Sequence, residues 1–305
     1  IMKVNFKIMR PKGFHASIEK NLKKCIKRVR KNSGWEKRIF CPICKKKKFF
    51  LWLKKLDIPI YFCLNCTTRF TGLIPKNIKD VYDNSAQFNF HLKSYEKNRK
   101  YRIKRFGRER VNLISRFKKK GNLLDIGCGN GWFLEAAKSK FKVSGVEENL
   151  QLCKFVKDKL KINVYNSLKK LKKNSFDVVT LFDVIEHVKN PILFLKEINR
   201  FLKKNGIILI FTPNSESLGF HYLKEKNNLI IPPYHLTYFN LKSFNYLPKN
   251  FKVIYKKTFG MDFFDIFAHQ RDTKNILLDK NIDLNKSQKI LDDLNYSNHV
   301  RVVLR

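Results

Sequence analysis

The stretch Leu123-Leu124-Asp125-Ile126-Gly127-Cys128-Gly129-Asn130-Gly131 is the most informative part of this chain for its fold. In it an apolar strand runs into three glycines at alternate positions, and a helix is predicted to begin at Trp132. Glycine lets a backbone turn sharply and approach a ligand closely, and the start of a helix presents free N–H groups. The stretch therefore predicts a ligand-binding turn between a strand and a helix.

An acidic residue at the end of the following strand narrows the range of candidate ligands. Sixteen residues after Gly131, the next predicted strand ends in Gly145-Val146-Glu147, where a carboxylate can accept both hydroxyls of a ribose. A dinucleotide site prefers G-x-G-x-x-G, whereas this turn reads G-x-G-x-G and follows an acid, Asp125. Asp125 would repel a pyrophosphate but suits a ligand that carries an amino group. The pattern favours S-adenosylmethionine over NAD, and the alternative is a structural glycine turn in an unrelated α/β domain.

From Asn122 onward, apolar segments alternate with amphipathic ones. Strands are predicted at about 122–127, 142–147, 162–165, 176–182, 206–212, 251–258 and 298–304. Helices are predicted at 131–140, 149–160 and 191–203, with a helical insertion over 262–296. The alternation predicts an α/β fold with a Rossmann-like, seven-stranded, mostly parallel sheet and helices on both faces.

Two Cys-x-x-Cys pairs precede this region. Cys41 and Cys44 are separated by 18 residues from Cys63 and Cys66, and two such pairs on tight turns can close a tetrahedral four-sulfur site for Zn²⁺. With four protein ligands the metal has no open position, so a structural role is predicted. The alternatives are four unrelated buried cysteines or a redox pair.

The net charge of +40 suggests a nucleic-acid partner at first sight. However, 50 of the 65 basic residues are Lys and only 15 are Arg, while Asn (29) is frequent and Ala (5) is rare. These are the preferences of AT-rich codons, so a solvated basic surface is favoured over a dedicated nucleic-acid face. No apolar run reaches the 18 or so residues of a membrane span, and a cytoplasmic protein is expected.

The run LLDIGCGNGWFLEAA at 123–137 closely resembles motif I of the class I S-adenosylmethionine-dependent methyltransferases. The segment 175–188 looks like their fourth strand and the loop after it, and the match continues over 202–214 and 235–239. Composition and pattern divide the chain into a basic N-terminal extension without strong periodicity (1–38), a zinc-ribbon-like segment (39–75) and a helical connector (76–118), and the resemblance identifies 119–305 as a methyltransferase domain. The zinc-ribbon-like segment and the aromatic helix after it are similar to a subgroup of bacterial methyltransferases of surface-polysaccharide and sugar-modification pathways.

The resemblance implies a cofactor site at the strand ends. It places Asp125 near the amino end of the cofactor, and Gly127, Gly129 and Gly131 in the turn beneath the cofactor. It assigns Glu147 to the ribose.

Three further residues complete the implied cofactor site. Asn166 reaches the adenine, and Phe182 with Asp183 lines the methionine side. Two positions depart from the family pattern: Lys45 stands where a glycine usually follows the first cysteine pair, and Asn166-Ser167 stand where an acid often follows the third strand.

Methyl transfer to a hydroxyl also needs a group that removes a proton. His187 directly follows the fourth strand and is one candidate general base, and His235 in a later loop is the second. His187 could instead cap a helix, or Asp183, Glu186 and His187 could hold a divalent metal, as in some related quinone O-methyltransferases.

The leading hypothesis is a methyltransferase acting on a hydroxyl of a small molecule or glycan precursor. The alternative is an RNA or protein methyltransferase that docks through the zinc segment and the basic stretch 97–120. A third possibility is a binding module with a degenerate domain, which the intact Asp125 and Glu147 argue against.

Overall fold

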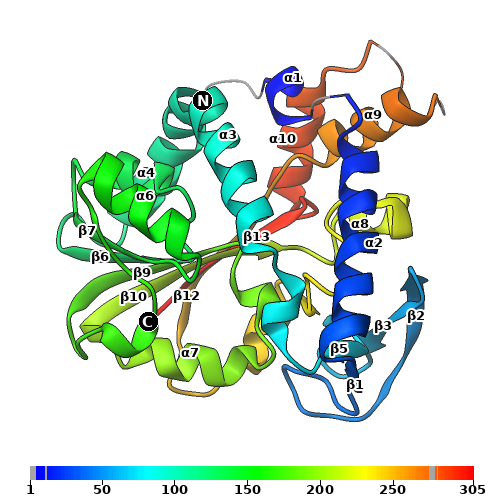
Figure 1. Ribbon diagram of the computed structural model, residues 1–305, viewed down its shortest axis with the longest axis horizontal. Helices are drawn as coiled ribbons and strands as arrows, with labels where there is room; N and C mark the ends of the chain where they lie inside the picture. Colours follow the sequence, from blue (N-terminus) through cyan, green and yellow to red (C-terminus); the bar gives the residue numbers. More distant parts are fainter. Residues whose placement is uncertain (1–4, 11, 275–278, 280) are drawn as a thin grey trace.

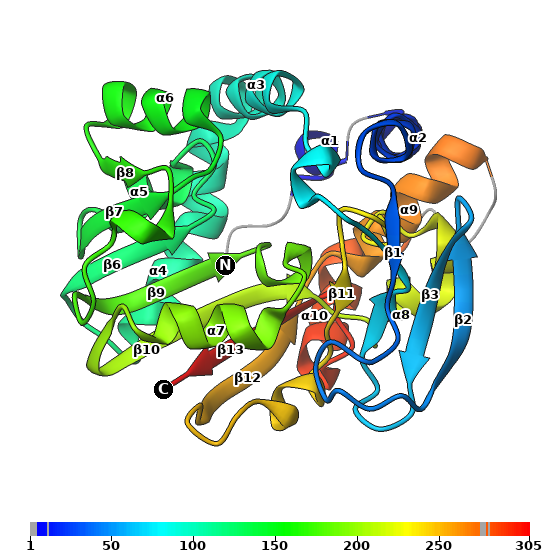
Figure 2. The same cartoon turned by 60° about the horizontal axis from the view of Figure 1, so that its bottom comes forward.

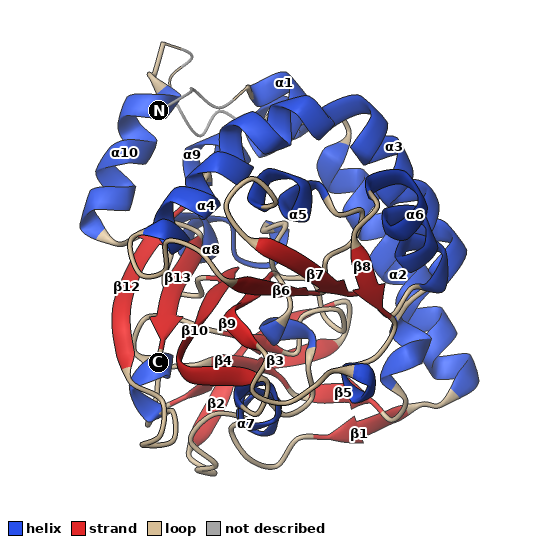
Figure 3. Cartoon of the chain, turned by 90° about the vertical axis from the view of Figure 1, so that its left-hand side faces the viewer, coloured by secondary structure: helices blue, strands red, loops and turns tan. Residues whose placement is uncertain are grey.

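The computed structural model describes residues 5–10, 12–274, 279 and 281–305. Its largest sheet has seven strands in the order β12-β13-β10-β9-β6-β7-β8 (Figure 3). The bounds are Asn122–Ile126 (β6), Lys142–Val146 (β7), Asn163–Tyr165 (β8), Phe176–Phe182 (β9), Leu202–Pro213 (β10), Val253–Phe259 (β12) and His299–Leu304 (β13). The strands β10, β9, β6, β7 and β8 pair in parallel, and β13 is antiparallel to both of its neighbours. The predicted α/β fold class is confirmed.

Helices cover both faces of this sheet, because successive residues of a buried strand point to opposite sides. Leu123 and Leu209 pack with α4 (Arg108–Ser115), α5 (Trp132–Ala137) and α6 (Leu150–Leu160). Leu124 and Ile210 point the other way, toward α7 (Pro191–Asn199). Figure 2 shows α6 above the sheet and α7 below it.

The predicted boundaries hold closely except at one junction. The helix predicted over 191–203 ends at Asn199, because Leu202 already pairs with Phe176 as the first residue of β10. The predicted insertion 262–296 contains α9 (Asp262–Thr273) and α10 (Leu284–Leu294).

The N-terminal region is more regular than its sequence suggested. After α1 (Phe6–Met9), the 19-residue helix α2 spans Phe14–Asn32 and buries Leu22, Cys25, Ile26 and Val29. These four residues follow helical spacing. The basic extension is therefore largely an amphipathic helix (Figure 1).

The connector leads from the cysteine segment to the large sheet. After η1 (Ile78–Val81), Asp83 accepts a hydrogen bond from the Ala86 N–H and begins α3 (Asn84–Arg102). A π-helical turn (Ile103–Gly107) links α3 to α4. A Cβ at Gly107 would lie 2.6 Å from the Ala136 Cβ, so the π turn packs tightly against α5.

The cysteine segment forms an antiparallel sheet of β2 (Phe49–Lys55), β3 (Ile58–Cys63) and β4 (Arg69–Thr71). The fourth strand of this sheet is β11 (Thr237–Tyr238), which comes from the other end of the chain and pairs with β4. A separate ribbon joins β1 (Trp35–Lys37) to β5 (Leu73–Pro75). The loop that carries His235 is thereby attached to the cysteine segment.

Candidate active site

The glycine turn after β6 has the backbone that only glycine adopts without strain. Gly127, Gly129 and Gly131 all have left-handed φ angles, of 72°, 54° and 77°. A Cβ at Gly127 would lie 2.6 Å from Val184 Cγ2, and one at Gly131 would lie 2.8 Å from Leu160 Cδ1. Both conformation and close packing thus require glycine here.

Asp125 lies at the carboxyl end of β6, beneath the turn. Its side chain is 3% exposed and accepts a 2.6 Å hydrogen bond from Thr180 Oγ1 on β9. Desolvation raises the pKa of Asp125 to about 7, although the Thr180 bond and the nearby Arg110 act in the opposite direction. A cationic ligand group beside Asp125 would stabilise its ionised form.

Glu147 connects the second strand to the glycine turn. One carboxylate oxygen accepts from the Gly129 N–H and the other from the Asn149 N–H, both at 2.9 Å. Each oxygen keeps a second lone pair for a ligand hydroxyl. Desolvation raises the pKa of Glu147.

Asn166 lies one strand further along, directly after β8. It borders a cavity of about 320 Å³. The other lining residues, from α6 and β8 and the segment after it, are Leu150, Cys153, Lys154, Lys157, Val164, Tyr165 and Lys170. The Glu147 N–H donates to the Tyr165 carbonyl (2.9 Å), so Asn166 and Glu147 are on neighbouring strand ends.

Phe182 is the last residue of β9, and Asp183 directly follows it. The Phe182 ring packs edge-on against Phe133 (centroids 4.7 Å apart) and Phe211 (4.8 Å). Asp183 has a φ of 57°, rare for a residue with a side chain, and its Oδ1 lies 3.4 Å from His299 Nε2. Although desolvation acts in the opposite direction, His299 and Arg110 lower the pKa of Asp183 to about 2.

Helix α3 lies over the glycine turn, a feature that the sequence did not indicate. Asn130 Nδ2 donates to the His91 carbonyl (2.9 Å), and Asn149 Nδ2 donates to the Asn84 carbonyl (2.8 Å). A Cβ on Gly129 would lie 3.1 Å from the His91 ring. The connector therefore closes one side of the candidate cofactor site, and its aromatic pattern carried no signal of this contact.

Both candidate histidines belong to one cluster with Glu186. One ligand atom each from Glu186, His187 and His235 lies within 4.8 Å of the others. The His187 and His235 ring centroids are 4.8 Å apart, and Glu186 Oε1 is 4.0 Å from His187 Nε2. This juxtaposition joins the loop after β9 to a segment about 50 residues later.

Backbone carbonyls determine which nitrogen of each ring is free. His187 Nδ1 lies 2.8 Å from the Tyr234 carbonyl, and His235 Nδ1 lies 2.8 Å from the Leu229 carbonyl. A carbonyl only accepts, so each Nδ1 carries the proton and each Nε2 keeps a lone pair. Desolvation lowers the pKa of both histidines, which keeps them neutral at pH 7.

Glu186 is the unusual member of this cluster. It is fully buried; its Oε2 accepts from Thr212 Oγ1 (2.9 Å), while its Oε1 has no hydrogen-bond partner among the described residues. Two imidazole nitrogens and a carboxylate oxygen suit a divalent transition metal. The metal hypothesis from sequence grouped Asp183 with Glu186 and His187, whereas the structure puts His235 in this group and pairs Asp183 with His299.

The four cysteines also converge. The Sγ atoms of Cys41 and Cys66 are 3.5 Å apart, as are those of Cys44 and Cys63, and all four lie within 4.8 Å of one another. Tetrahedral coordination at about 2.3 Å implies sulfur–sulfur distances of about 3.8 Å, so the donor set fits Zn²⁺. Lys45 has a φ of 60°, which explains why related knuckles place glycine there.

The cysteine segment also holds the loop of His235. Thr71 Oγ1 donates to the His235 carbonyl (2.7 Å), and the Thr71 N–H donates to the Leu236 carbonyl (3.1 Å). Arg38 donates to the carbonyls of Leu236 (2.6 Å) and Lys189 (2.8 Å). The sequence showed no sign of these contacts, because they join residues more than 150 positions apart.

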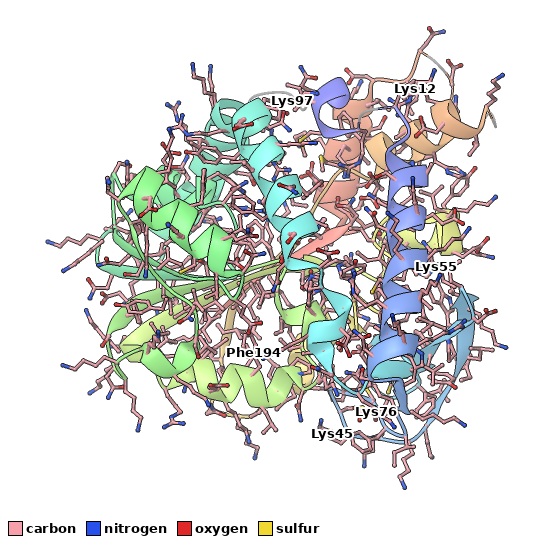
Figure 4. All side chains as sticks on the ribbon, in the orientation of Figure 1. Lys12, Lys45, Lys55, Lys76, Lys97 and Phe194 are labelled. Carbon is pink, nitrogen blue, oxygen red and sulfur yellow. The ribbon has the colours of Figure 1, made fainter. Side chains whose placement is uncertain are left out.

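Basic side chains are distributed over the molecule. The labelled residues Lys12, Lys45, Lys76 and Lys97 lie on four separate segments (Figure 4). Among the residues the structure describes, no helix is long and apolar enough to cross a membrane.

Known proteins are similar in sequence to this chain. A family model described as a methyltransferase domain matches residues 95–251. A ubiquinone biosynthesis O-methyltransferase of Pelagibacter ubique is 38% identical over 119 residues, covering 34% of this chain and 50% of that protein. An (S)-coclaurine N-methyltransferase of Papaver somniferum is 26% identical over 177 residues, covering 53% of this chain and 50% of that protein. The chain spans about half the length of these curated relatives.

Solved structures resemble the chain more distantly. The crystal structure of a SAM-dependent methyltransferase from Archaeoglobus fulgidus has 24% sequence identity and a TM-score of 0.42, covering 65% of this chain and 93% of its own. The family model, by contrast, spans just over half of the present sequence and includes the glycine turn, Glu147, Asp183 and both histidines. The chain belongs to the S-adenosylmethionine-dependent methyltransferases of this family.

Proposed function

We propose that this protein transfers a methyl group from S-adenosylmethionine to a hydroxyl oxygen of a small molecule or a sugar or glycan precursor. The observation that carries the proposal is the cluster of Glu186, His187 and His235, in which two neutral imidazoles with free Nε2 atoms lie beside a buried carboxyl group. A hydroxyl acceptor needs such a base, whereas an amine acceptor does not need one to the same degree. The Pelagibacter relative carries the name of an O-methyltransferase, which agrees with this choice.

In the proposed cofactor site, Asp125 pairs with the amino group, and the turn of Gly127, Gly129 and Gly131 lies beneath the methionine part. Glu147 accepts the ribose hydroxyls. The carboxylates of Asp125 and Glu147 are buried and hydrogen-bonded, so both are already held in place for these contacts.

The remaining cofactor contacts come from the strands on either side. We assign Asn166 to the adenine, and Phe182 with Asp183 to the methionine side. The cofactor supplies a sulfonium-bound methyl group, which makes the displacement favourable, so the protein mainly aligns the acceptor and manages its proton.

His187 is the proposed general base. Its Nε2 takes the proton of the acceptor hydroxyl as the oxygen attacks the methyl carbon, while Nδ1–H stays bonded to the Tyr234 carbonyl. Desolvation and the charge of Asp183 raise the pKa of Glu186, and the imidazolium that forms 4.0 Å from its Oε1 would favour the ionised carboxylate, which in turn stabilises that imidazolium. His235 orients the acceptor hydroxyl, or takes the proton in place of His187. In either case one imidazole accepts one proton and returns to the neutral state when it releases that proton to solvent.

A divalent cation is a second candidate occupant of this cluster. The unpartnered Glu186 Oε1 favours it, because a buried carboxylate without a partner is costly and a metal would neutralise it. The two Nδ1–carbonyl bonds would then orient the imidazole ligands, as second contacts to metal ligands usually do. Activity that survives thorough chelation would exclude this role.

For the four cysteines we propose a structural Zn²⁺ that stabilises the segment from β2 to β4. Seven cysteines without a disulfide among them agree with the proposed cytoplasmic location. One equivalent of tightly bound zinc, lost when Cys63 is replaced by Ser, would support the site. A purified protein that is folded without zinc would contradict it.

Label transfer tests the proposed function. The protein and methyl-labelled S-adenosylmethionine are incubated with host extract, which is then separated into nucleic acid, protein, lipid–glycan and small-molecule pools. Base-stable, ether-linked label in the glycan or small-molecule pool is expected. Label in RNA or protein would instead establish the alternative in which the basic surface docks a macromolecule.

A further inference from the structure

A second cavity, of about 210 Å³, has Asp183 among its lining residues. Its aromatic wall consists of Phe106, Trp132, Phe211 and Phe259. Met9 from the N-terminal segment and Met261 from the start of α9 also line it. The cavity thus lies beside the residue that we place at the methionine side of the cofactor.

The charges around this cavity do not balance. Three arginines line it, but only Arg301 pairs with a lining carboxylate, that of Glu109. The other lining carboxylate, on Asp183, pairs with His299 (3.4 Å). Within the described ranges, the structure gives neither Arg102 nor Arg110 a hydrogen bond or a carboxylate within 4.0 Å.

Aromatic rings hold both of these guanidinium groups. The Arg110 guanidinium carbon lies 4.1 Å from the Phe182 ring centroid and 4.9 Å from that of Trp132, and the Arg102 carbon lies 5.8 Å from the Trp132 centroid. Such stacking leaves the N–H edge of a guanidinium free for an anion. Desolvation lowers the pKa of Arg110 to about 10, so its charge persists at neutral pH.

The π-helical turn explains how both arginines reach one wall. In a regular α-helix, residues eight positions apart differ by about 80° around the axis. The wider turn of Ile103–Gly107 lies between Arg102 and Arg110 and reduces that difference. A π turn at such a place is a frequent feature of functional sites.

We propose that this cavity binds a carboxylate or phosphate group of the methyl acceptor, held between Arg102 and Arg110. The inference rests on the proposed function and specifies its substrate class: the acceptor is an anion. A planar guanidinium binds either oxyanion through two parallel hydrogen bonds. S-adenosylmethionine carries a single carboxylate, so a cofactor that engages one arginine leaves the other for the acceptor.

The location suits this role. Asp183 lines the cavity and also interacts electrostatically with His187 and His235. In this proposal the anion of the acceptor lies between the arginines and its hydroxyl lies beyond Asp183, toward the proposed base. The aromatic wall would pack against its apolar part.

The test uses the full-length protein saturated with S-adenosylhomocysteine, so that the cofactor carboxylate is already bound. Inorganic phosphate and acetate are titrated while the fluorescence of Trp132 is followed, with Trp132→Phe identifying its signal among the three tryptophans. The expected result is saturable binding that Arg102→Gln and Arg110→Gln each weaken at least tenfold. Arg108→Gln is the matched control, because Arg108 is exposed on the same helical segment and its replacement removes the same charge outside the cavity.

Three outcomes would overturn the proposal. The anions fail to bind the saturated protein, or they bind only the protein without S-adenosylhomocysteine and are displaced when it is added, which makes the cavity the carboxylate site of the cofactor alone. Equal weakening by Arg108→Gln would show general attraction to a basic surface. Failure of the protein to bind S-adenosylhomocysteine at all is a separate result, which contradicts the proposed function rather than this inference.

Discussion

The two halves of the candidate active site are built differently. The cofactor half, around Asp125, Gly129 and Glu147, comes mainly from the two adjacent βα units of β6 and β7, and its hydrogen bonds join residues at most 65 positions apart. The acceptor half joins the loop after β9 to the loop of His235, which Thr71 holds from 164 positions away. Local sequence can therefore specify the first half, while the second depends on how distant segments pack.

The largest effect is expected from a substitution that disrupts the cofactor half. Gly129→Arg introduces a side chain at a φ of 54°, with its Cβ 3.1 Å from His91. We expect the Kd for S-adenosylhomocysteine to rise on the order of a hundredfold or more, because strain and overlap both oppose the bound geometry. Calorimetry measures the affinity, and circular dichroism checks the fold.

Gly34→Arg is the control for this variant. Gly34 has a φ of 72°, but a Cβ added there would have no atom within 4 Å. Gly34→Arg therefore introduces the same kind of backbone strain outside the cofactor site. Equal loss of affinity in both variants would show that general destabilisation, not the glycine turn, was measured.

The next largest effect is expected from a substitution that impairs proton transfer in the acceptor half and leaves cofactor binding in the other half unchanged. His187→Ala should lower turnover in the label-transfer reaction by roughly 10²–10⁴-fold, the usual contribution of a general base. The Kd for S-adenosylhomocysteine should stay within about twofold, because binding energy at the cofactor is separate from proton transfer. His221→Ala, at a half-exposed position that pairs with Glu216, is the comparison. Unchanged turnover would remove His187 from the proposed mechanism.

A smaller effect concerns the role of Asp125. Its pKa of about 7 in the free protein means that the carboxylate is mostly protonated at pH 5.5 and mostly ionised at pH 7.5. The affinity for S-adenosylhomocysteine, whose amino group is cationic, should therefore rise roughly tenfold across this range. Asp125→Asn should bind more weakly and show little pH dependence. A pH-dependent affinity that persists in the variant would assign the titration to another group.

The effect of Asp125 on folding stability should have the opposite sign: stability should fall as pH rises, whereas the affinity for the cofactor should rise. A carboxyl group whose folded pKa is raised keeps its proton while the unfolded chain loses it, so it costs stability as pH rises from about 4 toward 7. Asp125→Asn should remove this cost. Urea unfolding of both proteins at pH 5 and pH 7.5 makes the comparison.

The smallest effect is expected from a substitution that weakens the attachment of the His235 loop to the cysteine segment. Thr71→Val removes the hydrogen bond to the His235 carbonyl, worth about 1 kcal/mol, so turnover should fall roughly fivefold if this bond positions the loop. Thr71→Ser keeps the hydroxyl and should restore turnover. Equal turnover in all three proteins would mean that β4–β11 pairing alone holds the loop.

The order of strands and helices and the glycine turn could be predicted from the residues alone. Alternating and helical periodicities report which faces are buried, and left-handed backbone positions are marked by glycines. The same local rules placed Asp125 and Glu147 at strand ends, where parallel strands bring them together. The amphipathic spacing in α2 was present in the sequence but hidden by its many lysines.

The acceptor side, in contrast, emerged only once the chain was folded. The grouping of His235 with Glu186 and His187 and the pairing of Asp183 with His299 follow from packing between segments that share no local pattern. The common wall of Arg102 and Arg110 depends on a π-helical turn that the sequence did not indicate. Their partners are backbone carbonyls and aromatic rings, which leave no signature in residue spacing. Sequence predicts what a segment does to its own backbone, while contacts between distant side chains depend on how the whole core is filled.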